Sequence, residues 1–340
     1  MKRTIAAIVA TMAIVAFASC AKNKSGSTSS KSGTIKIGIS KILAHPALDA
    51  SEQGIKDYLK QKGIDADIDV QNANGDVAVS AQIAQKFKAD GKQVVVGIAT
   101  PTAQALVQTF PASSNVPIVF AAVTDPVEAG LVNSWSGDAS SNVCGVSDIT
   151  PVEEQIKVFS AITGAKTIGN IYASGESNSI VLKNMIEAAC KKFGLKLVDA
   201  SVSNTAEVKT VMQSIINRVD AIYIAPDNTV NSALAAVSEV AAANRKPFFC
   251  ADPTNTDNLE SLIGWGFDYY SIGLEAGAMI EKILNGANAG SLGSVKLTDP
   301  AKFELHINLD NAKKLGISIP DELVKNATVV IENGKVSKKK

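Results

Sequence analysis

Residues 94–126 decide the fold of this chain, because they contain two successive units of strand, polar corner and helix start. From Val94 to Pro126 they read VVVGIATPTAQALVQTFPASSNVPIVFAAVTDP. The run 94–98 is apolar and mostly β-branched, which is typical of a strand buried on both faces of a parallel sheet, and the apolar run 117–123 predicts a second buried strand. Each run stops at a polar corner with helix-start signals, Thr100-Pro101-Thr102 and then Thr124-Asp125-Pro126.

The carboxyl edge of an open α/β sheet is where ligands bind, so these two corners are candidate site residues. The alternative is that the same polar residues only cap helices, which alone stabilises a helix by ~1 kcal/mol. The sequence leaves both interpretations open for each residue.

The same plan extends along most of the chain. Strands and helices alternate from residue 34 to residue 146, and a second series of the same kind starts at Ser147 and runs to residue 251. The polar corners of this second series lie at 174–179, at 226–229 and at Asp252-Pro253. Two similar α/β halves with polar strand ends imply a cleft between two lobes.

The first residues indicate export. Met1-Lys2-Arg3 is basic, and residues 5–17 are apolar but too short to span a bilayer comfortably. Ala18-Ser19-Cys20 resembles a bacterial lipoprotein signal, so we expect residues 1–19 to be a signal peptide and Cys20 to be lipidated. The alternative is an ordinary signal peptide with an incidental cysteine. Residues 20–33 are rich in Ser, Gly and Lys, which predicts a flexible tether.

Composition and motifs argue against several functions. The chain has 33 basic and 33 acidic residues, so no global field favours nucleic acid. Two histidines cannot form a multi-histidine metal site, and no G-x-S-x-G nucleophile elbow is present. Beyond Cys20 the three cysteines lie in or beside apolar runs without metal-binding spacing. We therefore expect a protein that is not an enzyme and uses no metal or cofactor.

Seven short runs, in one order, resemble a known family. The set is similar to the ABC-transporter substrate-binding lipoproteins of the tryptophan/tyrosine-binding (TrpX-like) family, over about residues 34–335. The runs are His45-Pro46-Ala47-Leu48-Asp49, Gly97-Ile98-Ala99-Thr100-Pro101-Thr102-Ala103-Gln104, Val123-Thr124-Asp125-Pro126, Gly145-Val146-Ser147-Asp148, Gly175-Glu176-Ser177-Asn178-Ser179, Asp227-Asn228-Thr229-Val230 and Asp268-Tyr269-Tyr270.

The resemblance implies the α/β fold of type I periplasmic binding proteins, with two doubly wound parallel-sheet lobes and three hinge crossings. We expect the crossings near Ser147, near Asp252 and between Gly293 and Phe303. The first lobe would then contain residues 34–146 and 253–293, and the second lobe residues 147–252 and 294–335.

The resemblance also implies a function. The protein would capture an aromatic amino acid (tryptophan, tyrosine or phenylalanine) outside the cytoplasm and deliver it, as a monomer, to ABC permease subunits. It would be lipid-anchored, facing the periplasm or the extracellular space. A ligand sensor, a surface interaction protein, a branched-chain amino acid and another small carboxylate stay open as alternatives.

A zwitterionic ligand needs donors for its carboxylate, acceptors for its ammonium and an apolar slot for its ring. The corner from Thr100 to Ala103 offers hydroxyls and a helix N-terminus for the carboxylate. Asp227 or Asp252 would accept from the ammonium, while Phe120, Tyr172 and Tyr269 could line the slot or belong to the core. The full set of expected ligand-binding residues is Ser40, His45, Thr100, Thr102, Ala103, Thr124, Asp125, Asn178, Ser179, Asp227, Asn228 and Asp252.

Overall fold

The computed structural model describes residues 33–254 and 256–339. The expected signal peptide, most of the tether and the lipidation site at Cys20 lie outside the described residues. Within the described part of the chain, no helix is long and apolar enough to cross a membrane.

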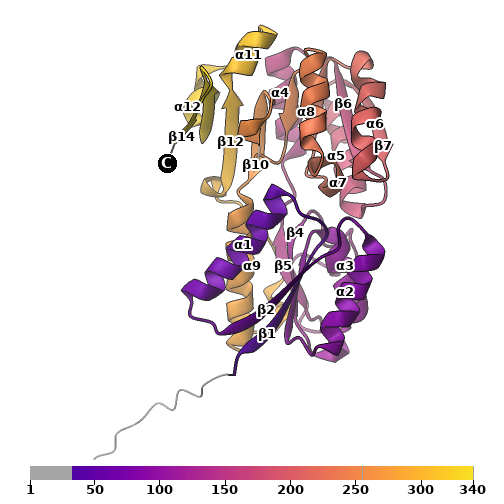
Figure 1. The fold of residues 1–340 in the computed structure, drawn as a ribbon, viewed down its shortest axis with the longest axis vertical. Helices are drawn as coiled ribbons and strands as arrows, with labels where there is room; N and C mark the ends of the chain where they lie inside the picture. The colour runs from indigo at the N-terminus through magenta and orange to yellow at the C-terminus, as the bar shows by residue number, and fades with distance from the viewer. Residues whose placement is uncertain (1–32, 255, 340) are drawn as a thin grey trace, which may run out of the picture. The chain divides into compact units, whose positions relative to one another are not determined.

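Two sheets form the centres of two lobes (Figure 1). The first lobe is built on a parallel sheet in which every pairing is parallel, with strand order β11-β5-β4-β3-β1-β2. Its strands β3 and β4 are the two runs that the sequence identified as buried, and every residue in them is buried. The strands are β1 (Ile35–Lys41), β2 (Ala66–Asn72), β3 (Val94–Ile98), β4 (Ile118–Val123), β5 (Val143–Ser147) and β11 (Ser294–Lys296).

The second lobe is built on a larger, mixed sheet of order β14-β13-β12-β10-β9-β8-β6-β7. Apolar residues pack against both faces of this sheet. Ile222 and Tyr223 are neighbours on one strand, and they belong to two different core clusters. The strands are β6 (Thr167–Ala173), β7 (Lys196–Val202), β8 (Ala221–Ile224), β9 (Phe248–Cys250), β10 (Ile263–Phe267), β12 (Phe303–Asn308), β13 (Val329–Glu332) and β14 (Lys335–Lys338).

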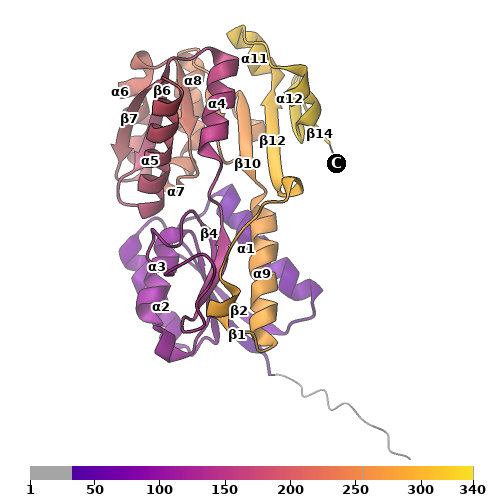
Figure 2. The ribbon, with the colours of Figure 1, turned by 180° about the vertical axis from the view of Figure 1, so that it is seen from behind.

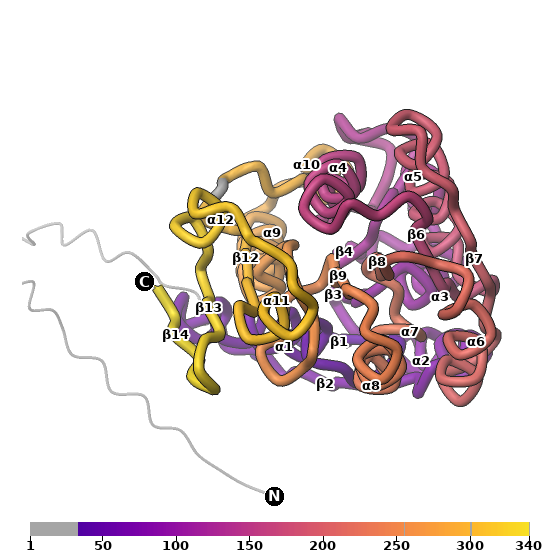
Figure 3. The backbone as a smooth tube through the Cα atoms, turned by 90° about the horizontal axis from the view of Figure 1, so that it is seen from above, coloured from indigo at the N-terminus to yellow at the C-terminus, as the bar shows by residue number. Residues whose placement is uncertain are grey.

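Helices cover both sheets. In the second lobe, α4 and α5 lie on one face and α6 and α8 on the other (Figure 3). The first-lobe helices are α1 (Pro46–Gln61), α2 (Val77–Ala89), α3 (Thr100–Thr109), α9 (Tyr269–Leu284) and α10 (Ala289–Leu292). The second-lobe helices are α4 (Val152–Thr163), α5 (Ser177–Lys192), α6 (Val208–Ile215), α7 (Asn228–Asn231), α8 (Leu234–Ala243), α11 (Leu309–Leu315) and α12 (Asp321–Asn326). Short 3-10 turns cover Ala112–Ser114, Thr205–Glu207, Ile216–Arg218, Thr256–Asn258 and Pro300–Lys302.

The chain passes between the lobes three times, and two expected boundaries are wrong (Figure 2). The first crossing lies between Ser147, the last residue of β5, and Val152, the first residue of α4. The second lies at Asp268 instead of near Asp252, because β10 pairs with β9 and β12 in the second sheet. The third crossing lies between β11 and β12, inside the expected interval. However, β11 pairs with β5 in the first sheet, so residues 294–296 belong to the first lobe instead of the expected second lobe.

The second and third crossings also explain why the second sheet is mixed. Strand β10 leaves the second lobe at Phe267, and the chain returns at Phe303 from the same edge of the sheet. Strand β12 must therefore run antiparallel to β10, with Phe267 opposite Phe303. The two rings pack with centroids 4.4 Å apart.

Between these crossings, α9 belongs to the first lobe because it packs closely against α1. A Cβ placed on Gly54 would lie 2.3 Å from Tyr270 O, and one placed on Gly273 would lie 2.1 Å from Ser51 O. Glycine at both positions lets the two backbones touch. Gly273 and Gly277, which face Ser51 and Tyr58 of α1, therefore mark a helix–helix contact.

Candidate functional site

The boundary between the two lobes brings together polar side chains from the strand ends of both sheets. Gln104 of α3 donates from Nε2 to Ser177 Oγ of α5 at 3.3 Å, which joins the lobes directly. His45 of the first lobe lies close enough to Asp252 and Asn228 of the second lobe for both to raise its pKa. The candidate site is therefore the edge at which ligands bind in open α/β sheets.

In the first lobe, the corner between β3 and α3 directs hydrogen-bond donors to this boundary. Thr100, the first residue of α3, is 1% exposed, and its Oγ1 has no hydrogen-bond partner among the described residues. The preceding Ala99 has φ 78°, a strained conformation for a residue with a Cβ. The first-turn N–H groups of Thr100 and Thr102 lack intrahelical carbonyl partners because no helical turn precedes them.

Two other residues of this corner have structural partners. Thr102 Oγ1 donates to Ile98 O at 2.8 Å and Ala99 O at 3.0 Å. The Ala103 N–H donates to Ala99 O at 3.2 Å, and Ala103 packs against Gly97 with no room for a Cβ there. The polar atoms of these two residues thus serve the helix start.

Ser40 and His45 lie at the end of β1 and at the start of α1. Both side chains are buried, and Ser40 Oγ and His45 Nε2 have no partner in the described part of the chain. Burial lowers the pKa of His45, which keeps the ring neutral at pH 7, although nearby carboxylates oppose the shift. Lys41 is also buried and pairs with Asp49 and Glu52 of α1, which fixes the helix start beside His45.

The corner after β4 serves the structure of the first lobe. Thr124 Oγ1 donates to Asp148 Oδ1 at 3.2 Å. Asp125 Oδ1 accepts from Val127 N at 3.0 Å and Glu128 N at 3.2 Å, so it caps the backbone as the capping alternative predicts. The helix-start signal there yields only a turn, which ends at Gly130 in a left-handed conformation.

In the second lobe, the corners after β6 and β8 bring buried carboxyl and amide groups together. Asp227 Oδ2 accepts from Ala173 N at 2.7 Å, and Oδ1 accepts from Val230 N at 2.9 Å. Burial and then the nearby Glu176 raise the pKa of Asp227 to about 7, and the Ser179 side chain partly opposes this by hydrogen bonding. Asn178 is 4% exposed, and its Oδ1 has no partner among the described residues.

Two residues of this region, Glu176 and Asn231, are not in the set expected from the sequence. Glu176 is 7% exposed and accepts from Asn228 Nδ2 at 2.5 Å and Thr229 Oγ1 at 2.7 Å. Asn231, at the end of α7, is buried with an unpartnered Oδ1. Glu176 belongs to one of the seven family-like runs, and an acidic residue at a strand-to-helix corner was the available signal. No signal in the sequence marks Asn231 as a site residue, because it belongs to helix α7 and not to the strand-to-helix corner itself.

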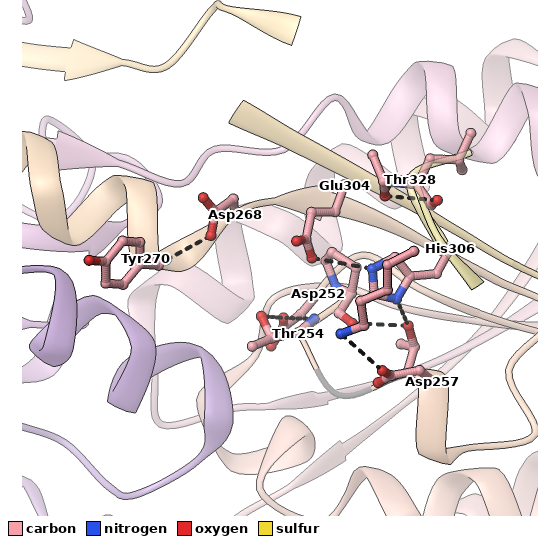
Figure 4. A network of polar contacts seen from close by, with 12 residues as sticks. Asp252, Thr254, Asp257, Asp268, Tyr270, Glu304, His306 and Thr328 are labelled. Carbon is pink, nitrogen blue, oxygen red and sulfur yellow. Dashed lines mark hydrogen bonds and ion pairs between the residues drawn. The ribbon is translucent and has the colours of Figure 1, made fainter. Parts of the chain in front are cut away.

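Asp252 follows β9 and forms a turn of its own. Its Oδ1 accepts from Thr254 N at 3.0 Å and from Thr254 Oγ1 at 2.6 Å. Figure 4 shows this pair beside a separate network in which His306 faces Glu304, with Nε2 and Oε2 3.2 Å apart. Asp252 therefore lies at the carboxyl end of β9 within the second lobe, and its charge raises the pKa of His45 across the boundary.

A buried pair connects two of the crossings. Tyr269 OH, just after the second crossing, donates to Asp148 Oδ2, in the first crossing, at 2.9 Å. Burial raises the pKa of Asp148 to about 6, although its hydrogen bonds with Tyr269 and Thr124 oppose this. Tyr269 is therefore part of the hinge region. Phe120 is fully buried against Gly145 in the core, whereas Tyr172 is half-buried.

Together, these groups define what the boundary can bind. Buried polar atoms almost always have hydrogen-bond partners, so unpartnered ones on both sides of one boundary indicate a polar ligand. The first lobe contributes hydroxyls and a helix N-terminus, and the second lobe contributes carboxylates and amide oxygens. No three His, Cys, Asp or Glu side chains in the described ranges are placed to hold a metal ion. The unpartnered atoms that we assign to this boundary are Ser40 Oγ, His45 Nε2, Thr100 Oγ1, Asn178 Oδ1 and Asn231 Oδ1; the other unpartnered buried atoms of the described residues belong to Asn170, Ser294 and His306.

Comparisons with known proteins agree with this geometry. Residues 36–331 match the family model described as ABC transporter substrate binding protein. The chain is 34% identical over 300 residues to a tyrosine-binding protein of Clostridioides difficile, covering 87% of this chain and 84% of that protein.

Two solved structures, each 32% identical to this chain and covering 88% of it, differ in how closely they match. The first is an ABC domain from Streptococcus pneumoniae in complex with L-Trp, covered completely, with a TM-score of 0.80. The second is the ligand-free, open form of a substrate-binding protein with adhesive properties from Clostridium difficile, 99% covered, with a TM-score of 0.65. This chain therefore superposes more closely on the L-Trp complex than on the ligand-free, open form.

Proposed function

Because this chain belongs to the ABC transporter substrate-binding protein family, we propose that its ligand is an aromatic amino acid bound between the lobes. The fold is that of type I periplasmic binding proteins. The single observation that carries the proposal is the set of unpartnered polar atoms at the lobe boundary, with donors in one lobe and acceptors in the other. A zwitterion complements both halves at once.

In this proposal the ligand carboxylate binds the first lobe. Thr100 Oγ1, Ser40 Oγ and the first-turn N–H groups of α3 would donate to it, and the helix dipole favours a negative charge there. The ammonium binds the second lobe, where Asn178 Oδ1 accepts and the buried Asp227 and Glu176 supply negative charge. Thr124, Asp125, Thr102 and Ala103 act indirectly, through the shape of the corners.

Binding would draw the lobes together around the three crossings, as in other two-lobed binding proteins. The Gln104–Ser177 bond supports this, because its two residues belong to different lobes. Closed protein would then present both lobes to the permease subunits of an importer.

Calorimetric titration tests the ligand assignment. The protein is unfolded and refolded to remove carried ligand, and then titrated with L-tyrosine, L-tryptophan, L-phenylalanine, L-leucine and myo-inositol. We expect one-to-one binding of an aromatic amino acid. A lack of heat with every amino acid, from protein that is folded by circular dichroism, would reject the assignment and favour a surface-interaction role.

A matched pair of variants tests the carboxylate site. Thr100→Val removes a hydroxyl without a protein partner, whereas Thr102→Val removes one that bonds its own backbone. Leaving a buried ligand oxygen unpaired costs about 1–3 kcal/mol, so Thr100→Val should weaken binding roughly five- to 150-fold. Thr102→Val should have a smaller effect on affinity. The reverse order would contradict the placement of the carboxylate.

We also propose that this extracytoplasmic protein is anchored through a lipid on Cys20. The support is the basic start, the apolar run and the small residues before the cysteine. Cys20→Ala should abolish incorporation of labelled fatty acid and release the protein from membranes. Unchanged labelling would place the anchor elsewhere.

A further inference from the structure

Glu176 is a buried carboxylate held by neutral donors. It is 7% exposed and lies at the N-terminal end of α5, opposite the first residues of α7. Its Oε2 accepts from Asn228 Nδ2 at 2.5 Å and Asn178 Nδ2 at 3.4 Å. Its Oε1 accepts from Thr229 Oγ1 at 2.7 Å and Thr229 N at 3.3 Å. The ion pairs of the described residues include none to Glu176, so these four donors are its partners.

This carboxylate determines how two amide groups are turned. The oxygen and nitrogen of an asparagine side chain lie on opposite sides of one planar group. A carboxylate only accepts hydrogen bonds, so both amides must direct Nδ2 toward Glu176. An amide oxygen in that position would face another acceptor. The Oδ1 atoms of Asn178 and Asn228 consequently face away from Glu176.

The two amide oxygens thereby face the lobe boundary, that of Asn228 toward His45 and that of Asn178 without a partner among the described residues. Asn178 Oδ1 is buried and has no partner in the described part of the chain. The Asn228 side chain reaches across the boundary and stabilises the charged form of His45, raising its pKa. The second lobe thus offers acceptors, next to the buried carboxyl groups of Asp227 and Glu176. A group that donates hydrogen bonds and carries positive charge complements this surface.

We propose that Glu176 is a positioning residue for ligand selection: by turning the Asn178 amide oxygen toward the ligand and the Asn228 amide oxygen toward His45, it makes the site select α-amino acids over the corresponding acids that lack the amino group. The proposal rests on the proposed function, because it assigns the ammonium end of the same ligand. Glu176 acts on that ligand through the two amides and through its charge.

The test compares two ligands that differ only in the ammonium group. Binding of L-tyrosine and 3-(4-hydroxyphenyl)propionate, and of L-tryptophan and indole-3-propionate, is measured by calorimetry with wild-type protein, Glu176→Gln and Glu187→Gln. Glutamine keeps the shape of Glu176 but removes its negative charge and replaces one acceptor oxygen by a donor, so the two amides are no longer held by an acceptor-only group. Glu187 is an exposed glutamate of the same helix and serves as the matched control.

We expect wild-type protein and Glu187→Gln to prefer the amino acid strongly. In Glu176→Gln, the ratio of amino-acid affinity to deaminated-acid affinity should fall at least tenfold, because binding of the amino acid weakens more than binding of the deaminated acid. A purely structural role would weaken both ligands equally and leave their ratio unchanged. An unchanged ratio would therefore overturn the proposal.

A second variant covers the case in which Glu176→Gln does not fold. Asn178→Leu removes the acceptor that Glu176 directs while retaining the carboxylate, and it should narrow the same ratio. An unchanged ratio in Asn178→Leu also overturns the proposal. The two failures are distinguishable. If wild-type protein binds no aromatic amino acid, the proposed function fails. If it binds one, and the variants keep the wild-type ratio of amino-acid affinity to deaminated-acid affinity, only the role of Glu176 fails.

Discussion

The hydrogen bond between Gln104 and Ser177 leads to a quantitative prediction about closure. Both side chains are half-buried, and Nε2 and Oγ are 3.3 Å apart. A neutral hydrogen bond contributes about 0.5–1.5 kcal/mol, and this one is slightly longer than the usual range. We therefore assign it about 0.5–1 kcal/mol, which corresponds to a roughly two- to fivefold change in affinity. Ser177→Ala should weaken ligand binding by that factor.

The lower affinity of Ser177→Ala should come from a faster rate of ligand dissociation, because the bond forms only when the lobes are together. Stopped-flow measurement should show faster ligand release from Ser177→Ala with an unchanged association rate. Gln104 also donates to Ala129 O within the first lobe, at 3.0 Å. A double-mutant cycle of Ser177→Ala with Gln104→Ala is needed to isolate the bond between the lobes.

The control is Ser214→Ala, since the Ser214 hydroxyl bonds only within its own helix, to Val211 O. It should leave both rate constants unchanged. If the two effects in the cycle simply add, with no coupling energy, the bond does not stabilise the closed form and the reasoning is refuted. An effect confined to association would refute it as well.

Three further predictions concern stability and pH. Gly273→Ala should lower the free energy of unfolding, measured by urea denaturation, by about 1–3 kcal/mol, because the new Cβ would lie 2.1 Å from Ser51 O. Helix propensity alone predicts a higher free energy of unfolding, and that result would contradict the close contact. Burial raises the pKa of Asp148 from 3.8 to about 6, so folding favours the protonated acid. The free energy of unfolding of wild type, relative to Asp148→Asn, should therefore fall by about 2 kcal/mol as pH rises from 4 to 6, and parallel curves would exclude this. Burial and Glu176 raise the pKa of Asp227 to about 7, and an ammonium ligand favours the ionised acid. Ligand affinity measured by calorimetry should therefore fall roughly tenfold from pH 8 to pH 6. An affinity that does not change with pH would place Asp227 far from the ligand.

Much of the fold follows from local sequence. The apolar runs of β3 and β4 were identifiable because a strand buried on both faces contains almost no polar residue. Helix starts such as Pro46 and Thr100-Pro101 were also visible in the sequence. The sheet to which β10 and β11 belong was not visible in the sequence, because a strand of three to five residues fits either sheet. Only pairing with β12 or with β5 determines which sheet each strand joins.

The site was predictable in position but not in the role of each residue. The sequence places Thr100 and Asp125 in equivalent corners, each just after a buried strand. In the structure Asp125 accepts from its own turn, whereas Thr100 Oγ1 is buried without a partner. A capping residue and a binding residue have the same local sequence signal, so their difference depends on what lies across the boundary.

The sequence by itself determined that strands end in polar corners along two α/β halves, because apolar periodicity and helix-start signals are local. The tertiary structure decided which of those corners face one another, since that depends on three crossings between the lobes. It also decided that Glu176 turns two amides toward the boundary, because those donors come from α5 and α7, two segments about 50 residues apart in the chain. Contacts between distant segments are set by packing and have no signature in local sequence.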